Sequence, residues 1–322
     1  MRILSGVQSS GKPHLGNYFG AIKQHIELQD REGAEPYYFI ADFHAMTTVQ
    51  DADTLRGFTL DVALDYLALG LDPARATFFR QSDVPQVTEL AWALSCVTGM
   101  GLLERAHSYK DKVARGIKPS VGLFYYPVLM AADILIYKSK LVPVGQDQVQ
   151  HIEMTQDMAE YFNNRYGVEV LVRPEPVLNQ TAKVPGTDGQ KMSKSYGNTI
   201  DLDMTGKKLK KTVMAIKTDS TSVEDPKDPD NCNVFALFQL VASEDEQAAL
   251  AEKYRAGGMG YGDAKKMLLE KIEEYFGPYR EKRAELENNL DHVEQVLREG
   301  AERAGAVAQA TLDEVKKASG LR

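Results

Sequence analysis

"RILSGVQSSGKPHLGNYFGAIKQHIELQ", residues 2–29, is the stretch that decides the fold. Its opening RILSGV predicts a short buried strand, and QSSGKP is typical of a turn. The remainder places Leu15, Phe19, Ile22 and Ile26 at steps of four, three and four, which is the apolar stripe of a helix. A strand that leads into a helix through a glycine-containing turn indicates the first unit of a parallel α/β sheet.

The same alternation continues outward from this stretch. Further strands are predicted at 37–45, 76–82 and 141–144, and helices at 54–70 and 147–167. Strands that alternate with helices favour an α/β fold with a Rossmann-like parallel sheet and helices on both faces. Ligands of such sheets bind beyond the carboxyl ends of the strands, where the loops gather.

The strand signal ends soon after residue 200. Later residues show helical stripes, such as Leu286, Leu290, Val293 and Leu297. We therefore expect two domains. The first, 1–204, is a Rossmann-like catalytic domain, and the second, 205–322, is an all-α C-terminal domain whose last helix could pack back on the first.

Composition excludes several classes of protein. A net charge of −8 disfavours a protein that coats nucleic acid, although the runs 105–118 and 207–217 are locally basic. Cys96 and Cys232 are far apart, which disfavours a disulfide framework or metal site and suits a reducing cytoplasm. The longest apolar stretch is interrupted by Asp133 and is too short to span a membrane.

Two segments carry residues that suit phosphate. In "PHLGN", His14, Gly16 and Asn17 stand in the first turn of a predicted helix, where N–H groups and the helix dipole attract anions. In "GQKMSKSYGN", residues 189–198, Lys191 and Lys194 stand among glycine and serine. An ordinary helix cap and ordinary surface lysines are the alternatives. Neither segment matches the G-x-x-x-x-G-K-[ST] loop.

Together the two segments match a known pair. "PHLGN" resembles the H-I-G-H signature of the class I aminoacyl-tRNA synthetases, and "KMSKS" is their second signature verbatim. "DFHAMT", "PVLMAADILIY" and "PVGQDQVQHIEMTQDMAEYFNNRYG" resemble the bacterial tryptophan-specific members, from residue 2 to about residue 200. Ser9, Gln146 and Tyr196 depart from residues common in that family.

This resemblance implies an activity in two steps. L-Tryptophan and ATP would form tryptophanyl-adenylate and pyrophosphate, with Mg²⁺ on the phosphates, and tryptophan would pass to the terminal adenosine of tRNA(Trp). The family is homodimeric, and its helical domain reads the anticodon. The alternatives are a tyrosine-specific relative and a non-translational paralogue that binds tryptophan and ATP. A cytoplasmic location is expected.

Asp133 fits tryptophan on physical grounds. It stands between Met130 and Ile134 in an apolar helix, where a carboxylate without a partner is costly. It could pair with a backbone N–H or a helix cap, or its partner could arrive with the substrate. An indole offers one N–H donor, which suits a carboxylate, whereas phenylalanine offers none.

The expected site therefore has three sets of residues and no metal ligands. Catalytic roles are expected for Lys191, Lys194, His14 and Asn17. ATP contacts are expected from Gln8, Ser10, Gly16, Asn17, Gly145, Asp147, Val184, Lys191, Ser193 and Lys194. Tryptophan contacts are expected from Leu4, His44, Tyr126, Met130, Asp133, Val142, Val144 and Gln148. A satisfied buried histidine is the alternative for His44.

Overall fold

The computed structural model describes residues 1–9, 11–106, 109–110, 114, 116, 120–178 and 184–321. Ser10, an expected ATP contact, and much of the basic run 105–118 lie outside these residues. The chain divides into two compact units. The first unit comprises Met1–Gly11, His25–Asn179 and Leu286–Arg322, and the second unit comprises Lys12–Gln24 and Gln180–Glu285.

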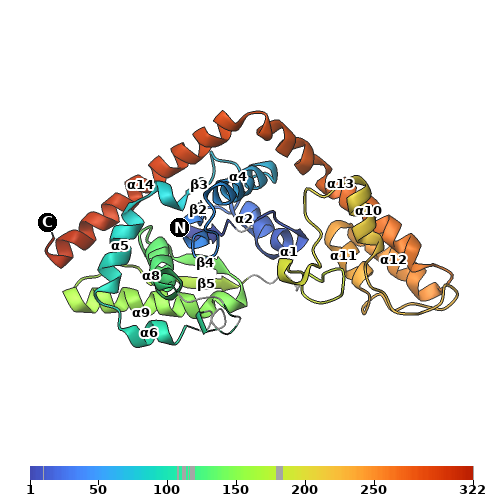
Figure 1. Cartoon of the computed structure of the whole chain (residues 1–322), viewed down its shortest axis with the longest axis horizontal. Coiled ribbons are helices and arrows are strands. Elements are labelled where there is room, and N and C mark those ends of the chain that lie inside the picture. Colours follow the sequence, from blue (N-terminus) through green and yellow to red (C-terminus); the bar gives the residue numbers. More distant parts are fainter. Residues whose placement is uncertain are drawn as a thin grey trace. The chain divides into compact units, whose positions relative to one another are not determined.

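A five-stranded parallel sheet forms the centre of the first unit, in the order β3-β2-β1-β4-β5 (Figure 1). The strands are β1 (Arg2–Val7), β2 (Glu35–Ile40), β3 (Thr77–Arg80), β4 (Leu141–Val144) and β5 (Glu175–Leu178). The strand order reverses between β1 and β4, which is where ligands of open parallel sheets bind. The predicted Rossmann-like parallel sheet is confirmed.

Helices cover both faces of this sheet. Tyr37, Phe39 and Phe79 belong to an apolar core shared with α5, α8, α9 and α14. Tyr38 and Phe78 alternate with them along the strands, and their rings stack on His25 and Tyr66 of α2 and α4. The bounds are α2 (Lys23–Leu28), α4 (Ala52–Ala68), α5 (Gln86–Ser95), α6 (Met100–Glu104), α8 (Val121–Leu135), α9 (Val149–Tyr166) and α14 (Leu290–Ser319).

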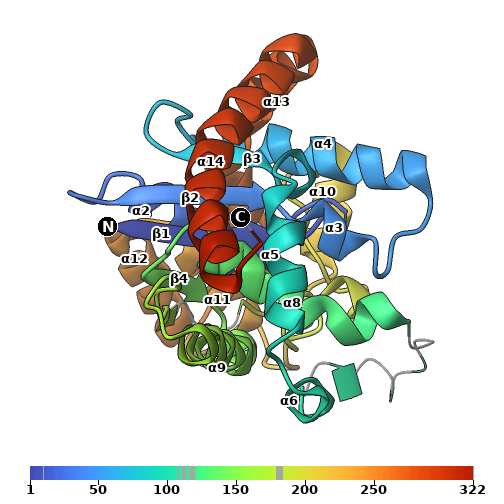
Figure 2. The same ribbon diagram turned by 90° about the vertical axis from the view of Figure 1, so that its left-hand side faces the viewer.

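The last helix, α14, packs against the edge strand β3 and against α5 (Figure 2). The approach is so close that a Cβ at Gly300 would lie 1.8 Å from the carbonyl oxygen of Phe78. Glycine is therefore required where this helix crosses the strand. Arg80 and Glu294 form an ion pair at the same contact.

One local prediction was wrong, and one strand was not predicted. The predicted strand 37–45 ends at Ile40, and Asp42–Ala45 form a short helix, α3. The strand β5 was not predicted, because its four residues have no fully buried member and no clear alternation of apolar and polar side chains.

The second unit is mainly helical. Its elements include α1 (Leu15–Asn17), a π-helix η1 (Tyr18–Ile22), a 3₁₀ turn η4 (Lys194–Tyr196), α10 (Gly206–Met214), α11 (Asn233–Val241), α12 (Glu244–Ala256) and α13 (Tyr261–Glu287). The predicted all-α character of the C-terminal part is confirmed. The two units do not follow the expected boundary at residue 204, because 12–24 and 180–204 group with the later helices. Among the described helices, none is long and apolar enough to cross a membrane.

Candidate active site

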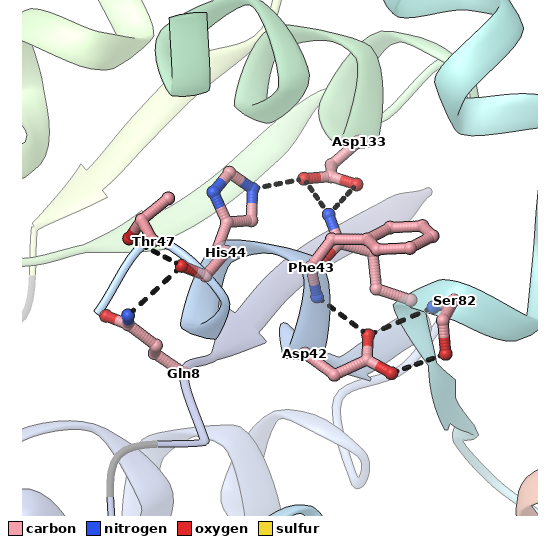
Figure 3. A network of polar contacts seen from close by, with 8 residues as sticks. Gln8, Asp42, Phe43, His44, Thr47, Ser82 and Asp133 are labelled. Atoms are coloured by element: carbon pink, nitrogen blue, oxygen red, sulfur yellow. Dashed lines mark hydrogen bonds and ion pairs between the residues drawn. The ribbon is translucent and has the colours of Figure 1, made fainter. Parts of the chain in front are cut away.

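Asp42 ties together the loops that follow β2 and β3. Its carboxylate accepts hydrogen bonds from the backbone N–H groups of Phe43 and Ser82, each at 3.0 Å, and from the Ser82 hydroxyl (Figure 3). Ser82 belongs to the 3₁₀ turn η2 (Gln81–Asp83). Asp42 thus links the loops at the carboxyl ends of two neighbouring strands.

Asp133 of α8 lies just beyond these loops and is only 2% exposed. Its Oδ2 atom is 2.8 Å from Nε2 of His44 (Figure 3). Gln81 Nε2 donates to both carboxylate oxygens, at 2.8 Å to Oδ1 and 2.9 Å to Oδ2. The sequence left open whether this carboxylate has a protein partner, and the structure supplies two. Neither is the backbone N–H or helix cap that was considered.

The ionisation of Asp133 is a balance between burial and these contacts. Burial raises the pKa of the Asp133 carboxyl, while the hydrogen bond and charge of His44 and the hydrogen bond from Gln81 oppose that rise. Both partners act as donors, so they favour the ionised, acceptor form of the carboxylate. The site therefore holds a buried acceptor that is in place before any ligand binds.

A second set of polar side chains lies beside the first. The rings of His44 and Tyr126 meet edge to face, 6.2 Å apart. The Tyr126 hydroxyl is 2.7 Å from His151 Nε2, and His151 Nδ1 is 3.1 Å from Gln148 Oε1. Gln148 Nε2 donates to Asp147 at 3.0 Å. Since the Gln148 oxygen accepts, His151 carries its proton on Nδ1 and accepts from Tyr126.

Four expected tryptophan contacts, His44, Tyr126, Asp133 and Gln148, are thus brought together in the first unit. Sequence reasoning missed the two residues that connect them, Gln81 and His151. His151 stands one helical turn after Gln148, a spacing that places both on one face, and this signal was available. Gln81 follows a strand directly, but nothing in its local sequence distinguishes it.

The apolar residues of the expected site divide into two groups. Leu4 and Val142 are buried members of the core beneath the polar groups. Met130 and Val144 are partly buried and pack against that core. Met130 lies on α8 one turn before Asp133, and the expected role of all four residues as apolar walls for tryptophan stays a prediction.

Gln8 and Gly145 lie at the carboxyl ends of β1 and β4. Gln8 Nε2 donates to the carbonyl oxygen of His44 at 3.4 Å, and Thr47 donates to the same oxygen at 2.8 Å (Figure 3). A Cβ at Gly145 would lie 2.7 Å from Oδ1 of Asp147. Glycine at this position therefore lets the Asp147 carboxylate lie against the backbone.

His14 and Asn17 form a reciprocal capping box at the start of α1. The His14 N–H donates to Asn17 Oδ1 at 3.1 Å, and the Asn17 N–H donates to His14 Nδ1 at 3.3 Å. Burial and then the charge of Lys194 lower the pKa of His14 to about 4. The ring is therefore neutral at pH 7 with its proton on Nε2. The alternative of a helix cap is therefore observed, and the expected role of His14 and Asn17 at phosphate stays a prediction.

The lysine loop, residues 184–198, packs in the same unit as His14. Met192 is buried, and a Cβ at Gly16 would lie 3.3 Å from the Met192 Cβ. The Met192 N–H donates to the carbonyl oxygen of Val184 at 2.9 Å. The buried Val184 thus supports the loop through its backbone. Lys191 and Lys194 themselves are exposed.

Asn198 holds the backbone of this loop and was missed in the sequence. It is 2% exposed. Its Oδ1 accepts from the N–H of Ser193 at 2.8 Å, and its Nδ2 donates to Asp188 at 2.7 Å and to the carbonyl oxygen of Lys191 at 3.2 Å. The backbone that carries these two exposed lysines is therefore fixed by a buried side chain.

These features define a nucleotide-using enzyme of the Rossmann-like class. A parallel sheet presents polar side chains at its carboxyl edge, and a helix start lies beside a cationic loop. Among the described residues, no group of three or more His, Cys, Asp or Glu side chains could hold a metal ion.

The particular family is shown by comparison. The chain belongs to the family described as tRNA synthetases class I (W and Y), whose model matches residues 1–277. It is 56% identical over 321 residues to tryptophan–tRNA ligase of Fusobacterium nucleatum, covering 99% of this chain and 98% of that one. It is 55% identical over 322 residues to that of Rhodopirellula baltica, covering both chains completely.

A solved structure agrees with the fold. The crystal structure of tryptophanyl-tRNA synthetase from Campylobacter jejuni, complexed with ADP and tryptophan, matches with a TM-score of 0.94 at 49% identity. The match covers 99% of this chain and 100% of that one. The Rossmann-like catalytic fold with a helical C-terminal part extends over the full length of the chain.

Proposed function

We propose that the chain is a tryptophan–tRNA ligase. It activates L-tryptophan with ATP, forms tryptophanyl-adenylate and pyrophosphate, and transfers tryptophan to the 3′-terminal adenosine of tRNA(Trp). The observation that carries the proposal is the buried, hydrogen-bonded acceptor Asp133 at the carboxyl edge of the sheet. Relatives that are 49–56% identical over the full length carry the same name, which disfavours a tyrosine-specific enzyme.

Asp133 accepts the indole N–H in this proposal. Phenylalanine has no donor and would leave a buried carboxylate without its last partner, which costs roughly 10⁴-fold or more in selectivity. Tyr126 donates its hydroxyl proton to His151, so its oxygen acts as an acceptor toward other partners. That orientation suits the substrate ammonium group, and Gln148 is held next to it through His151.

The adenylation step needs no general base, because the attacking carboxylate of tryptophan is already ionised at pH 7. One carboxylate oxygen forms a bond to the α-phosphorus, and the bond from that phosphorus to the oxygen of pyrophosphate breaks. Lys191 and Lys194 stabilise the negative charge that develops on the phosphates. His14 donates from Nε2 as a neutral ring, and Asn17 lies beside it.

The remaining nucleotide contacts belong to the same proposal. Gln8, Gly145 and Asp147 are assigned to the nucleotide, with Asp147 accepting from a ribose hydroxyl. Gly16, Val184, Ser193 and Ser10 are assigned to it as well. Mg²⁺ enters as part of the nucleotide substrate, since the described residues contain no cluster of ligands that would hold it on the protein alone.

The tRNA contacts are assigned to the helical part, 205–322, as an anticodon-binding domain that follows the catalytic domain 1–204. Four lysines of α10 are exposed and would contact the phosphate backbone: Lys207, Lys208, Lys210 and Lys211. Such contacts position a nucleic acid and carry no sequence information. A cytoplasmic location follows from this partner and forms part of the proposal.

A homodimer is also proposed, through exposed apolar side chains of the first unit: Trp92, Met100 and Val121. Their exposed fractions are 72%, 62% and 83%, which is unusual for such large apolar side chains. Trp92 borders a cavity of about 430 Å³, and Met100 and Val121 border another of about 500 Å³. A second copy would cover these side chains. Trp92→Glu should shift sedimentation from dimer to monomer, and an unchanged dimer would contradict the assignment.

The activity is tested by exchange of pyrophosphate into ATP with each of the twenty amino acids. Strongest exchange with tryptophan, together with charging of tRNA(Trp), is expected. Strongest exchange with tyrosine would establish the tyrosine-specific alternative. Exchange with tryptophan without any charging of tRNA would establish a non-translational paralogue.

A further inference from the structure

Gln81 is placed against both oxygens of Asp133 by the first turn after β3. It is 1% exposed, and its Nε2 lies 2.8 Å from Oδ1 and 2.9 Å from Oδ2. A single nitrogen at nearly equal distances from both oxygens sets the direction and rotation of a carboxylate. The neighbouring Ser82 is tied to Asp42, so the turn that carries Gln81 is itself anchored.

The contacts of Asp133 leave one acceptor position. An ionised carboxylate accepts about four hydrogen bonds, two on each oxygen. Among the described residues, Oδ2 accepts from His44 and Gln81, whereas Oδ1 accepts only from Gln81. The remaining position is therefore on Oδ1, on the side away from the Gln81 nitrogen.

The amide oxygen of Gln81 indicates that this residue is kept for its contact with Asp133 and not for packing. Its Oε1 atom is buried and has no hydrogen-bond partner among the described residues. Buried polar atoms without partners are rare, and each calls for an explanation. The assignment of the amide is clear, because the opposite orientation would place an oxygen against the carboxylate. A glutamine kept only for packing would be better replaced by an apolar residue of similar size.

We infer that Gln81 is a specificity-determining residue that positions Asp133 and directs its Oδ1 atom to the indole N–H of tryptophan. This inference rests on the proposed function. Gln81 acts through Asp133 and contacts no reacting atom, so it is a positioning residue. Its loss leaves the carboxylate held by His44 at Oδ2 alone, and a carboxylate held at one oxygen distinguishes tryptophan less well from amino acids without an N–H donor.

The main test uses Gln81→Met, which keeps the side-chain length and removes the donor. In pyrophosphate exchange, the KM for tryptophan should rise roughly 10-fold to 100-fold, because a hydrogen bond to a charged group has been lost. The kcat and the KM for ATP should change less than about threefold, since neither depends on this contact. The preference for tryptophan over phenylalanine should fall with the rise in KM.

A double-mutant cycle separates positioning from general structural damage. If Gln81 acts through Asp133, the double variant Gln81→Met with Asp133→Asn should resemble Asp133→Asn alone, within about threefold. If the double variant instead shows the product of the two single-variant changes in tryptophan KM, the two residues act independently and the inference is overturned. Gln86→Met is the matched control, because it makes the same substitution at a glutamine of the first unit whose side chain donates to Gln309 and not to Asp133, and its tryptophan KM should stay within about threefold of wild type.

A charge variant keeps the test decisive if Gln81→Met fails to fold. In Gln81→Glu, two carboxylates face each other, and one of them should take up a proton as the pH falls from 8 to 6. The added proton restores a donor to Asp133, so the tryptophan KM should fall over this range. His44 and Asp42 on α3 and Tyr137 beyond α8 also face Asp133, and wild type measured in parallel corrects for their titration.

The outcomes distinguish a failure of the proposed function from a failure of the role of Gln81. Wild-type protein without tryptophan-dependent exchange would contradict the proposed function itself. Active wild type with an unchanged tryptophan KM in Gln81→Met and a flat pH profile in Gln81→Glu would overturn the role of Gln81 alone.

Discussion

Asp133 in the first unit and the lysine pair in the second unit carry opposite charges in opposite surroundings. The Asp133 carboxylate is 2% exposed and accepts hydrogen bonds from Gln81 and His44. Lys191 and Lys194 are exposed, while Asn198 holds the backbone beneath them. In one region a buried side chain is held by two hydrogen-bonding residues, and in the other a buried asparagine holds the backbone of a loop with two exposed lysines.

This difference follows from what each region has to do. Choosing one amino acid requires a desolvated acceptor whose geometry is set in advance, because the penalty for a wrong substrate comes from an unpaired buried group. Stabilising charge that moves from one phosphate to another suits compact charges on flexible stems. In the proposed function, the first region therefore determines selectivity, and the second determines rate.

The largest expected effect comes from removing the carboxylate that is proposed to recognise tryptophan. Asp133→Asn should lower kcat/KM for tryptophan roughly 10³-fold to 10⁴-fold, because the new amide places a donor against the donors of Gln81 and His44. The ATP affinity, measured by equilibrium binding, should stay within about threefold and serves as the internal control. Unchanged tryptophan kinetics would mean that Asp133 is only structural.

The next largest effect is expected on the rate of adenylate formation, through the lysine pair. Lys194→Ala should slow adenylate formation in single turnovers roughly 10²-fold to 10³-fold, while the Kd for ATP changes less than about threefold. Lys210→Ala is the matched control, because it removes an exposed lysine of the same unit and should leave adenylation unchanged. A loss of ATP affinity as large as the loss of rate would contradict a transition-state role.

The two units also differ in how they keep a histidine neutral. Burial alone lowers the pKa of His25 in the first unit to about 4, whereas burial and Lys194 do so for His14 in the second. The unfolded histidine has a pKa near 6.5. Below that value the unfolded chain binds the proton first, so folding stability is lost as the pH falls from 6.5 to 4.

For the fully buried His25 this loss is about 3 kcal/mol. Urea unfolding at pH 7 and pH 4.5 should show it in wild type. In His25→Phe the difference between the two pH values should shrink by roughly 2 kcal/mol, because pH 4.5 lies about half a unit above the folded pKa of His25. A difference of the same size in both proteins would show that other groups account for the acid sensitivity.

The smallest expected effect is on the support of the lysine loop. Asn198→Ala removes the hydrogen bonds to Ser193, Asp188 and Lys191, so adenylate formation should slow about 10-fold through misplacement of the lysines. Asn231→Ala provides the control, since Asn231 makes a similar side-chain bond in an exposed turn. A rate unchanged by Asn198→Ala would show that the loop keeps its geometry without this residue.

Much of this protein was determined by local sequence. The apolar periods of two and 3.6 residues lie within single strands and helices, and the order of these elements follows from the sequence. The parallel sheet and the helical remainder were therefore predictable. The signatures around His14 and Lys191 are contiguous and were found directly. Even Asp133 was visible, because a charge in an apolar helix is conspicuous in the sequence alone.

Only the tertiary structure decided how those residues are held. Gln81, His44 and Asp133 are 37 to 89 positions apart, and they meet because the segments that follow β2 and β3 bring His44 and Gln81 to the helix that carries Asp133. Ala41–Ala45 was predicted as strand because its apolar residues continue those of β2, yet Asp42 begins a short helix and its carboxylate accepts hydrogen bonds from the N–H groups of Phe43 and Ser82. Hydrogen-bond partners distant in sequence depend on packing, and no local period contains that information.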